Sequence, residues 1–410
     1  MMKKLSSLFF AALLLLADTD VLASDPRGNN NSAKKGIVTG ADQTSKYLPY
    51  LKGKRVAMVA NQTSIIGNQL SVDSLLKLGV NIVKVFGPEH GFRGNASNGA
   101  RVGDEVDAKT GIPIISLYGK NEKPTAKQLA DVDLVIFDIQ DVGCRFYTNI
   151  NTLEYVMEAC AENNKELMIF DRPNPNGYLI DGPVLEDKYK SAIGIHNIPM
   201  THAMTIAEFA QMLNGEGYIE SGKTKLNIVK LANYNHAMKY DLPVKPSPNL
   251  NTQQSILLYP SLCWFEGTVI NEGRGTQSPF AILGAPALKG RYEFSYKPVA
   301  IPGMSEFPQH KDKQCYGIDL REYDTDLLRK SGQVNLGWLI ELYKAYPEKD
   351  KFFPVNPRTG IATFDLRSGN SRLREQIIAG VPEADIRKSW EPGLKAFKAM
   401  RAKYLLYPDK

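Results

Sequence analysis

Cysteine is scarce in this sequence: the 410-residue chain has four, at Cys144, Cys160, Cys263 and Cys315. Four cysteines are too few for a disulfide scaffold, and the missing C-x-x-C pair excludes a zinc ribbon and a thioredoxin-like redox site. Nothing in their spacing selects one disulfide pairing. We therefore expect the four side chains to be small buried apolar groups, as free cysteines usually are.

The sequence also lacks the short motifs that bind nucleotides or activate the common hydrolases. No G-x-G-x-x-G loop follows the first predicted strand and no P-loop is present, which argues against a dinucleotide or a nucleoside triphosphate. The G-x-S-x-G turn of α/β esterases and H-E-x-x-H are missing as well. The five histidines are scattered. We therefore expect no cofactor and no metal; a metal site built from His90, Asp138 and His196 is the alternative.

Charge of one sign is only slightly in excess. Lys and Arg number 50 against 44 Asp and Glu, a formal net charge of +6, and no block of like charges forms a nucleic-acid-binding arm. With 43% hydrophobic and 23% charged residues, the composition is that of an ordinary globular protein. The length suggests two domains, and the small basic excess is compatible with an anionic substrate.

A long apolar run is present near the N-terminus. Two lysines precede the apolar stretch at 8–16, and Val21-Leu22-Ala23 offers a small-residue cleavage site, so residues 1–23 have the layout of a secretory signal peptide. The run is too short to span a bilayer, and no cysteine follows it to carry a lipid anchor. We expect an exported protein, periplasmic or secreted, with no membrane partner after cleavage. The polar segment 24–45 is expected to be a flexible leader.

Regular hydrophobic patterning begins near residue 54. Short apolar, β-branched runs alternate with helical patterns, one of which, at 152–163, has apolar residues at i, i+3, i+4 and i+7. Strands without polar alternation, separated by helices, are typical of a parallel sheet covered on both faces. We therefore predict a doubly wound α/β domain over residues 46–230. The other predicted elements are strands at 56–60, 81–86, 112–116, 134–138 and 167–170, and helices at 71–78, 125–130 and 205–214.

The pattern changes between residues 220 and 240. The remaining segment, 231–410, is predicted to be a smaller mixed α+β auxiliary domain that contributes to a cleft between the two parts. Thr205 and Glu208 fit a capping box just before this change. The predicted elements of the later part are strands at 226–231, 291–301 and 315–320, and helices at 337–346, 372–379 and 393–404.

Polar residues follow three of the predicted strands. The sequence continues with Gly-Pro-Glu-His-Gly-Phe-Arg-Gly at 87–94, with Asp-Ile-Gln-Asp-Val-Gly at 138–143 and with Asp-Arg-Pro-Asn-Pro-Asn-Gly at 171–177. Ligands of open α/β sheets bind at the carboxyl ends of the strands, near the switch point of the strand order. The three strand ends therefore predict a site at this edge, although Asp138 or Asp171 alone equally fits a helix cap or a loop brace.

Three glutamates lie among glycines and aromatic residues: Glu89, Glu266 and Glu272. Cleavage of a glycosidic bond needs one protonated carboxyl group for the leaving oxygen and a second, ionised group as nucleophile, base or charge stabiliser. Apolar neighbours such as Phe86, Phe92 and Trp264 would help an acid to keep its proton near neutral pH. The three glutamates are therefore candidates for acid/base chemistry.

Arginines and aromatic residues accompany these carboxylates. A guanidinium binds a carboxylate with two parallel hydrogen bonds, so Arg93, Arg145 and Arg274 are candidates to bind an anionic group of the substrate. The aromatic candidates for flanking a sugar ring are Tyr118, Tyr147 and Trp264.

Four segments together indicate a family. Gly-Pro-Glu-His-Gly-Phe-Arg-Gly (87–94), Phe-Asp-Ile-Gln-Asp-Val-Gly-Cys-Arg-Phe-Tyr-Thr (137–148), Asp-Arg-Pro-Asn-Pro-Asn-Gly (171–177) and the Glu-Gly-Thr and Glu-Gly-Arg-Gly-Thr runs within 266–276 are long and specific. With them the chain resembles, from about residue 35 onward, the NamZ-like exo-β-N-acetylmuramidase family (glycoside hydrolase family 171, formerly a domain of unknown function). One local difference is the bulky Cys263-Trp264-Phe265 run before Glu266, where the family has leucines.

The resemblance implies a Rossmann-like catalytic domain, a C-terminal auxiliary domain and an active site in the cleft between them. It implies release of single N-acetylmuramic acid units from the non-reducing ends of peptidoglycan fragments, in cell-wall recycling. The lactyl carboxylate of this sugar makes a nearby arginine chemically sensible.

Roles follow for the candidate residues. Glu89 is expected to be the principal catalytic carboxylate, as the acid. Glu272 and Glu266 are near-equal candidates for the second carboxylate, and His90 is expected to orient Glu89, relay a proton or cap the turn. Substrate-assisted catalysis by the 2-acetamido group would remove the need for a protein nucleophile. The expected substrate-binding residues are Arg93, Asp138, Gln140, Arg145, Tyr147, Asp171 and Arg274.

Two other function classes are kept as alternatives. A two-domain α/β cleft also suits a non-catalytic periplasmic protein that binds muramyl sugars or peptidoglycan. A metal-dependent hydrolase would act on another bond of muramic acid.

Overall fold

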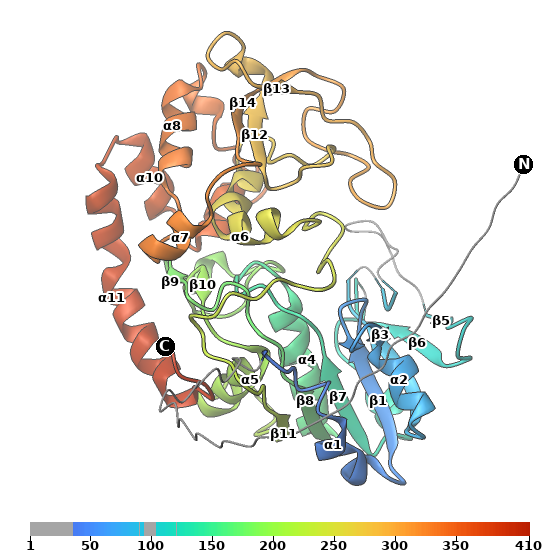
Figure 1. The fold of residues 1–410 in the computed structure, drawn as a ribbon. Helices are drawn as coiled ribbons and strands as arrows, with labels where there is room; N and C mark the ends of the chain where they lie inside the picture. The colour runs from blue at the N-terminus through green and yellow to red at the C-terminus, as the bar shows by residue number, and fades with distance from the viewer. Residues whose placement is uncertain (1–35, 90, 94–103, 120) are drawn as a thin grey trace, which may run out of the picture. The chain divides into compact units, whose positions relative to one another are not determined.

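The computed structural model describes residues 36–89, 91–93, 104–119 and 121–410 (Figure 1). The predicted signal peptide, most of the predicted leader and His90 lie outside the described residues. Residues 37–410 form one compact unit. The division into domains at residue 230 stays a prediction.

A seven-stranded sheet forms the centre of the N-terminal part, in the order β11-β8-β7-β1-β4-β6-β5 (Figure 1). All neighbours in it are parallel except β5 and β6. Its strands are β1 (Arg55–Ala60), β4 (Asn81–Gly87), β5 (Glu105–Val106), β6 (Pro113–Ser116), β7 (Leu134–Asp138), β8 (Glu166–Phe170) and β11 (Lys225–Val229). The chain leaves the central β1 first toward β4 and β6 and then toward β7, β8 and β11, which is the Rossmann strand order. The predicted doubly wound sheet is confirmed.

The register places the carboxyl ends of the central strands at one edge. Val59 of β1 pairs with Phe86 of β4 on one side and with Phe137 of β7 on the other. The segments that follow these three strands therefore leave the sheet side by side, on either side of the switch point between β1 and β7.

Helices cover both faces of this sheet. Alternate residues of β1 enter two different apolar cores: Ala57 and Val59 pack with α4 and α5, and Val56 and Met58 pack with α1 and α2. Burial on both faces explains why the strands are apolar without alternation. The covering helices are α1 (Thr44–Leu51), α2 (Ser71–Lys77), α3 (Ala126–Leu129), α4 (Asn149–Glu162) and α5 (Ile206–Gly215). The capping box predicted for α5 is present, with Thr205 and Glu208 as its two members.

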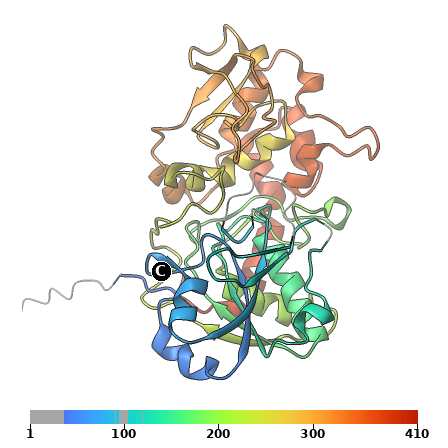
Figure 2. The ribbon, with the colours of Figure 1, turned by 90° about the vertical axis from the view of Figure 1, so that its right-hand side faces the viewer.

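The C-terminal part combines an antiparallel three-stranded sheet, in the order β12-β14-β13, with several helices (Figures 1 and 2). The strands are β12 (Ile282–Ala285), β13 (Ser295–Tyr296) and β14 (Cys315–Asp319). The helices are α6 (Gln253–Leu262), α7 (Asp326–Ser331), α8 (Gly337–Ala345), α9 (Thr363–Ser368), α10 (Arg372–Ile378) and α11 (Glu383–Arg401). Short pieces complete the chain: β2 (Ile65–Ile66), β3 (Gln69–Leu70), β9 (Ile180–Asp181), β10 (Thr201–His202) and the 3₁₀ helices η1 (Asp187–Tyr189), η2 (Cys263–Gly267), η3 (Pro286–Leu288), η4 (Lys349–Lys351) and η5 (Ala402–Tyr404).

Three predicted elements differ from the structure. The strand predicted at 291–301 is limited to β13, and the rest of that range lies outside strands. The strand predicted at 226–231 is β11, and it is the edge strand of the main sheet because it pairs in parallel with β8. Helix α11 begins at Glu383 instead of residue 393, with Pro392 inside it. Proline followed by glycine usually interrupts a helix, but Ile386, Trp390, Leu394 and Phe397 lie on one apolar face. Packing of that face outweighs the local signal.

Helix α11 also connects the two parts of the molecule (Figure 1). Ile386, Trp390 and Leu394 pack into the C-terminal core, whereas Phe397 packs into the core beneath the main sheet. A helix that contributes to both cores couples their positions. Among the described residues, no helix is both long and apolar enough to cross a membrane.

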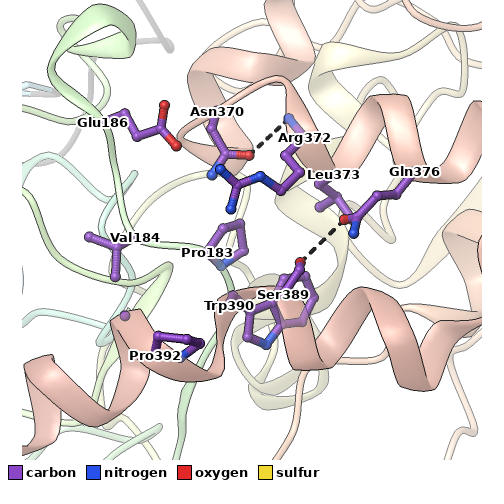
Figure 3. A pocket seen from close by; sticks show the side chains of 11 residues that line it. Pro183, Val184, Glu186, Asn370, Arg372, Leu373, Gln376, Ser389, Trp390 and Pro392 are labelled. Carbon is purple, nitrogen blue, oxygen red and sulfur yellow. Dashed lines mark hydrogen bonds between the residues drawn. The ribbon is translucent and has the colours of Figure 1, made fainter.

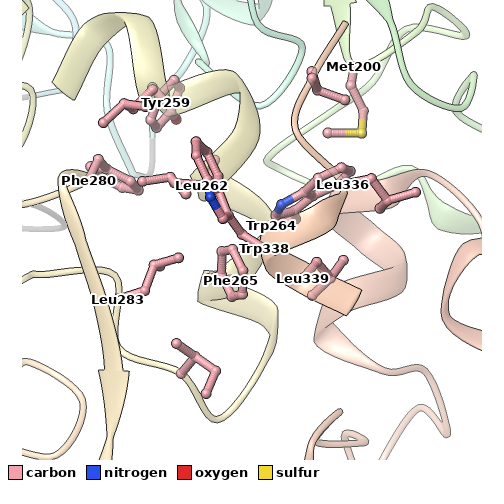
Figure 4. Close-up of a cluster of buried hydrophobic side chains, with 14 of the residues drawn as sticks. Met200, Tyr259, Leu262, Trp264, Phe265, Phe280, Leu283, Leu336, Trp338 and Leu339 are labelled. Carbon is pink, nitrogen blue, oxygen red and sulfur yellow. The ribbon is translucent and has the colours of Figure 1, made fainter. Parts of the chain in front are cut away.

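The bulky run before Glu266 fills the C-terminal core (Figure 4). Trp264 and Phe265 are fully buried among Leu262, Leu283 and Leu339. The expectation that Trp264 flanks a sugar ring is therefore wrong, because its indole is enclosed by apolar side chains. The expected burial of the cysteines is confirmed: all four are buried and none forms a disulfide.

Candidate active site

A cavity of about 310 Å³ lies at the carboxyl edge of the main sheet. One wall comes from segments that follow four strands: Asn61 after β1, Glu89 after β4, Tyr118 after β6, and residues between 146 and 155 after β7. The opposite wall comes from the C-terminal part, and it is lined by Pro246, Ser247, Leu250, Tyr259, Glu266, Arg274, Phe280 and Arg367. The cavity thus lies at the switch point, where an open α/β sheet binds its ligand.

A second cavity, of about 280 Å³, lies between the segment 183–186 and helices α10 and α11 (Figure 3). Its polar groups partly satisfy one another, since Ser389 Oγ donates to Gln376 Oε1 (3.3 Å) and Arg372 N donates to Asn370 Oδ1 (3.0 Å). None of the predicted site residues lines it. The cavity at the sheet edge is lined by Glu89, Tyr147, Glu266 and Arg274 of that set, and it is therefore the candidate active site.

Glu89 lies on the sheet wall beside two tyrosines. Burial, the negative charge of Glu89 and a hydrogen bond with it raise the pKa of Tyr118 to about 12. Burial, together with the charges of Asp141 and Glu89, raises the pKa of Tyr147 well above its usual value. Both hydroxyls therefore keep their protons at neutral pH. The Tyr147 hydroxyl donates to the Pro246 carbonyl (2.8 Å), which fixes the ring in the wall.

Glu266 lies on the opposite wall between two arginines. Arg274 donates through Nε and Nη2 to Glu266 Oε1 (3.0 and 2.7 Å), and Arg367 donates through Nε and Nη2 to Oε2 (3.2 and 3.1 Å). Cys263 Sγ also donates to Oε2 (3.4 Å). Glu266, Arg274 and Arg367 all line the cavity, whereas Cys263 does not. The wall therefore presents a carboxylate held by two guanidinium groups.

Two glycines allow this clamp to form. A Cβ atom on Gly267 would lie 2.4 Å from Phe364 Cα, so only glycine lets η2 approach α9 closely enough to bring Glu266 to Arg367. Gly273 has a φ of +86°, and a Cβ atom there would lie 2.5 Å from the Ser278 carbonyl oxygen. This turn directs the next residue, Arg274, back toward Glu266.

The pKa values of Glu266 and Glu272 are shifted in opposite directions. Burial alone would raise the pKa of Glu266, but the two arginines outweigh it and hold the pKa below its usual value. Glu272 is 3% exposed and outside the cavity lining, 3.0 Å from Arg274 Nε. Burial and the negative charge of Glu266 raise the pKa of Glu272. At neutral pH Glu266 is therefore ionised, which does not suit a general acid.

Tyr147 and Arg274 of the expected substrate-binding set line the cavity, with Glu89 and Glu266 of the catalytic set. Asp138 and Gln140 do not. The Asp138 carboxylate accepts from Arg172 Nε (2.7 Å), and both side chains are almost fully buried. The Gln140 amide donates to the carbonyls of Asp141 (2.8 Å) and Pro173 (2.7 Å). Both residues brace the loops behind the cavity instead of facing a ligand.

Asp171 caps a helix. Its carboxylate accepts from Thr205 Oγ1 (2.8 Å), Ala207 N (3.1 Å) and the Tyr407 hydroxyl (2.6 Å), at the N-terminus of α5. A carboxylate is favourable at a helix N-terminus, where backbone N–H groups lack partners. The helix-cap alternative for Asp171 is thus the one that the structure supports.

Two predicted arginines also have partners inside the protein. Arg145 is fully buried and donates to the carbonyls of Pro183 (3.0 Å), Ile198 (2.7 Å) and Arg367 (2.6 Å). Arg93 makes a bidentate pair with Asp107 (2.7 and 2.6 Å). Neither lines the cavity, so the structure gives them structural roles in place of the substrate-binding roles we expected.

The cavity contains residues that the sequence reasoning missed. Asn61 and Glu122 follow the strands β1 and β6, so the strand-end rule, applied to every strand, would have found them. Arg367 follows no strand and is 101 residues from Glu266, so no local signal indicates it. Among the described residues, no three His, Cys, Asp or Glu side chains are placed to hold a metal ion. Asp138 and His196 of the metal alternative pair instead with Arg172 and Glu154.

Comparisons with known proteins agree with this architecture. Residues 56–254 match the family model described as exo-beta-N-acetylmuramidase NamZ, N-terminal, and residues 257–407 match the corresponding C-terminal model. The chain is 38% identical to the peptidoglycan beta-N-acetylmuramidase NamZ of Bacillus subtilis (strain 168), over 99% of this chain and 100% of that protein.

Two crystal structures of DUF1343 family proteins from Bacteroides fragilis NCTC 9343 have the same fold. One has a TM-score of 0.83 at 40% identity and covers 92% of this chain and 100% of its own. The other has a TM-score of 0.76 at 30% identity and covers 90% of this chain and 99% of its own. With both family models matched in order along nearly the whole described chain, this protein belongs to the NamZ exo-β-N-acetylmuramidase family.

Proposed function

We propose that this protein is an exo-acting glycosidase that releases N-acetylmuramic acid from the non-reducing ends of peptidoglycan fragments. The observation that carries the proposal is the cavity at the switch point, which has Glu89 on the sheet wall and the Glu266–Arg274–Arg367 cluster on the opposite wall. The full-length similarity to a peptidoglycan beta-N-acetylmuramidase supports the same substrate class.

The two arginines suit the carboxylate that distinguishes muramic acid from other amino sugars. Arg274 and Arg367 use Nε and Nη2 to hold Glu266, and their Nη1 groups make no hydrogen bond to another described residue. Both guanidinium groups line the cavity. In this proposal they bind the lactyl carboxylate, and Glu266 keeps them oriented and reduces the excess positive charge.

Glu89 is the proton donor to the leaving oxygen in this mechanism. Glu266 is a poor nucleophile because two guanidinium groups neutralise it, and Glu272 lies behind Arg274, outside the cavity lining. The C-terminal wall therefore offers no suitable second carboxylate. The substrate's own 2-acetamido oxygen then attacks the anomeric carbon as the glycosidic bond breaks, and water opens the resulting ring. Glu122, on the same side of the cavity as Glu89, is available to polarise that amide.

The proposed location is the periplasm or the exterior of the cell. The basic residues and apolar run at the start of the sequence support export, and a peptidoglycan fragment with a muramic acid terminus is the expected partner. Release of single sugars from such fragments fits a role in cell-wall recycling.

Product analysis tests the function. The full chain is incubated with a disaccharide that has N-acetylmuramic acid at its non-reducing end, and with its isomer that has N-acetylglucosamine there. Mass spectrometry should detect free N-acetylmuramic acid from the first substrate only. Prolonged incubation that leaves the first disaccharide bound but intact would show a binding protein, and cleavage of the lactyl ether or the acetyl group would show another hydrolase.

A further inference from the structure

Phe307 is an unusually exposed aromatic residue. Its exposed fraction is 88%, whereas the other exposed large apolar side chains among the described residues lie between 39% and 64%. Phe307 is on the loop 297–314, which connects β13 to β14. Val299, 40% exposed, is on the same loop. A phenyl ring that stays in water gains no burial free energy in the isolated chain, so its apolar surface is available to a ligand.

The loop is tied to both segments that form the C-terminal side of the cavity. Before Phe307, the Met304 carbonyl accepts from Asn249 Nδ2 (2.8 Å), and Asn249 lies between the cavity residues Ser247 and Leu250. After Phe307, the Gln309 carbonyl accepts from Asn271 Nδ2 (3.0 Å). Asn271 Nδ2 also donates to the carbonyl of the cavity residue Arg274 (3.1 Å). The loop is therefore held, on both sides of Phe307, against segments that line the cavity.

Further contacts hold the loop in one position. Val299 N donates to the Gly275 carbonyl (2.8 Å), and Gln309 Nε2 donates to the Thr268 carbonyl (3.1 Å). A Cβ atom on Gly275, which has a φ of +82°, would lie 2.5 Å from Pro308 Cγ, so the loop packs directly on the residue after Arg274. The phenyl ring is thus presented by a backbone that is anchored at several points, as a ready-made platform requires.

The occupant follows from the proposed function, on which this inference rests. An exo-acting enzyme encloses the terminal sugar, and about 310 Å³ suits one such unit, so the rest of the saccharide must leave the cavity past its rim. The C–H face of a neutral sugar ring packs well on an aromatic ring. We propose that Phe307 is a binding platform for the saccharide on the leaving-group side of the scissile bond.

The test compares two substrates that differ only in the leaving group. One is the muramic-acid-terminated disaccharide or its tetrasaccharide, and the other is N-acetylmuramosyl fluoride, which has no leaving saccharide. For Phe307→Ala, kcat/KM on the saccharides should fall about tenfold. This is the effect expected when a bound saccharide no longer covers one face of a phenyl ring. The fluoride should be cleaved at the wild-type rate, and Phe307→Trp should restore most of the saccharide activity.

Leu78→Ala is the matched control, because Leu78 is 52% exposed and lies at the end of α2, away from the cavity lining. This variant should leave kcat/KM unchanged on both the saccharides and the fluoride. Equal losses on the saccharides and the fluoride, or no loss on either, would overturn the platform. A wild-type protein that cleaves neither substrate would instead contradict the proposed function, so the two failures can be told apart.

Discussion

Two pairs of carboxylates near the sheet edge have opposite surroundings. Asp138 and Asp171 directly end or follow their strands and are fully buried. Asp138 Oδ1 accepts from Arg172, and the Asp171 carboxylate caps α5. Glu89 lies in the segment after β4 and Glu266 lies in the 3₁₀ helix η2, and both line the cavity. Position at a strand end predicts that a side chain reaches the edge. It does not predict whether its partner belongs to the protein or to a ligand.

The difference lies in whether the donors that hold each carboxylate are themselves buried or face the cavity. Asp171 has donors from α5 and from the C-terminal tail, so nothing is left for a substrate. Glu266 also has several donors, but these belong to Arg274 and Arg367, which have further N–H groups and face the cavity. We expect carboxylates of the first kind to stabilise the fold and those of the second kind to act in the chemistry. Variants that separate activity from stability test this distinction.

The largest effect is expected for Glu89→Gln. The amide has the shape of the carboxyl group but cannot donate a catalytic proton, so kcat/KM should fall by about 10³. The melting temperature should stay close to that of the wild type because Glu89 lies on a cavity wall. Steady-state kinetics on the muramic-acid-terminated disaccharide and thermal unfolding are the measurements.

Glu122→Gln is the companion variant on the same wall, and its loss should be smaller. Asp138→Asn provides the contrast, since it should lower the melting temperature by leaving the buried Arg172 without its ion-pair partner. Near-native turnover by Glu89→Gln would show that the acid is another residue.

A smaller effect is expected for Arg367→Ala. It removes one of the two guanidinium groups that face the cavity, and a charged hydrogen bond to a substrate carboxylate contributes about 2 kcal/mol, or roughly 30-fold in kcat/KM. The loss should be specific for muramic acid, so the preference over an otherwise identical substrate ending in N-acetylglucosamine should shrink. Arg367→Lys should recover little, because the guanidinium fork that holds Glu266 is lost.

Arg374 offers the matched control for this variant. It pairs with Asp365 (2.8 and 2.9 Å) and lies outside the cavity lining. Arg374→Ala should leave the substrate preference unchanged. If Arg367→Ala lowers activity equally on both substrates, the residue holds Glu266 without recognising the lactyl group.

The sheet could be predicted from the sequence because its signals are local and consistent. The apolar strands, the intervening helices and the Thr205 capping box all indicate the same doubly wound arrangement. Helix α11 was shortened in the prediction because Pro392 and Gly393 are local breakers, whereas its stability comes from packing into two cores that the local sequence does not reveal.

The site could be predicted only in part, for a related reason. Glu89 and Tyr147 lie in motifs that follow strands, so their position at the edge was accessible. Arg145 lies in a similar motif, but its guanidinium turns inward to three carbonyls, and Arg367 comes from a distant helix. Which arginine faces the cavity depends on tertiary packing, which neither charge nor spacing encodes.

The smallest effect on activity is expected for Asp171→Asn, which should change the stability of the fold and its dependence on pH. Burial raises the pKa of Asp171 to about 7 from an ordinary 3.8. The folded state therefore holds this proton more tightly than the unfolded state does. Its contribution to stability is complete below pH 3.8 and is lost as the pH rises through 7. Asparagine cannot ionise, so thermal unfolding should show a smaller fall in melting temperature between pH 5 and 8 than in the wild type.

Asp107→Asn is the control of opposite sign. The hydrogen bond from Arg93 lowers the pKa of Asp107 to about 2, so its contribution to stability is present above the unfolded pKa and is lost only as the pH falls toward 2. Between pH 5 and 8 both states have Asp107 ionised, and its replacement should lower the melting temperature by the same amount throughout. A pH-independent difference for Asp171→Asn as well would mean that the donors from Thr205, Ala207 and Tyr407 keep Asp171 ionised. The helix cap would then hold its charge as firmly as the cavity wall holds that of Glu266.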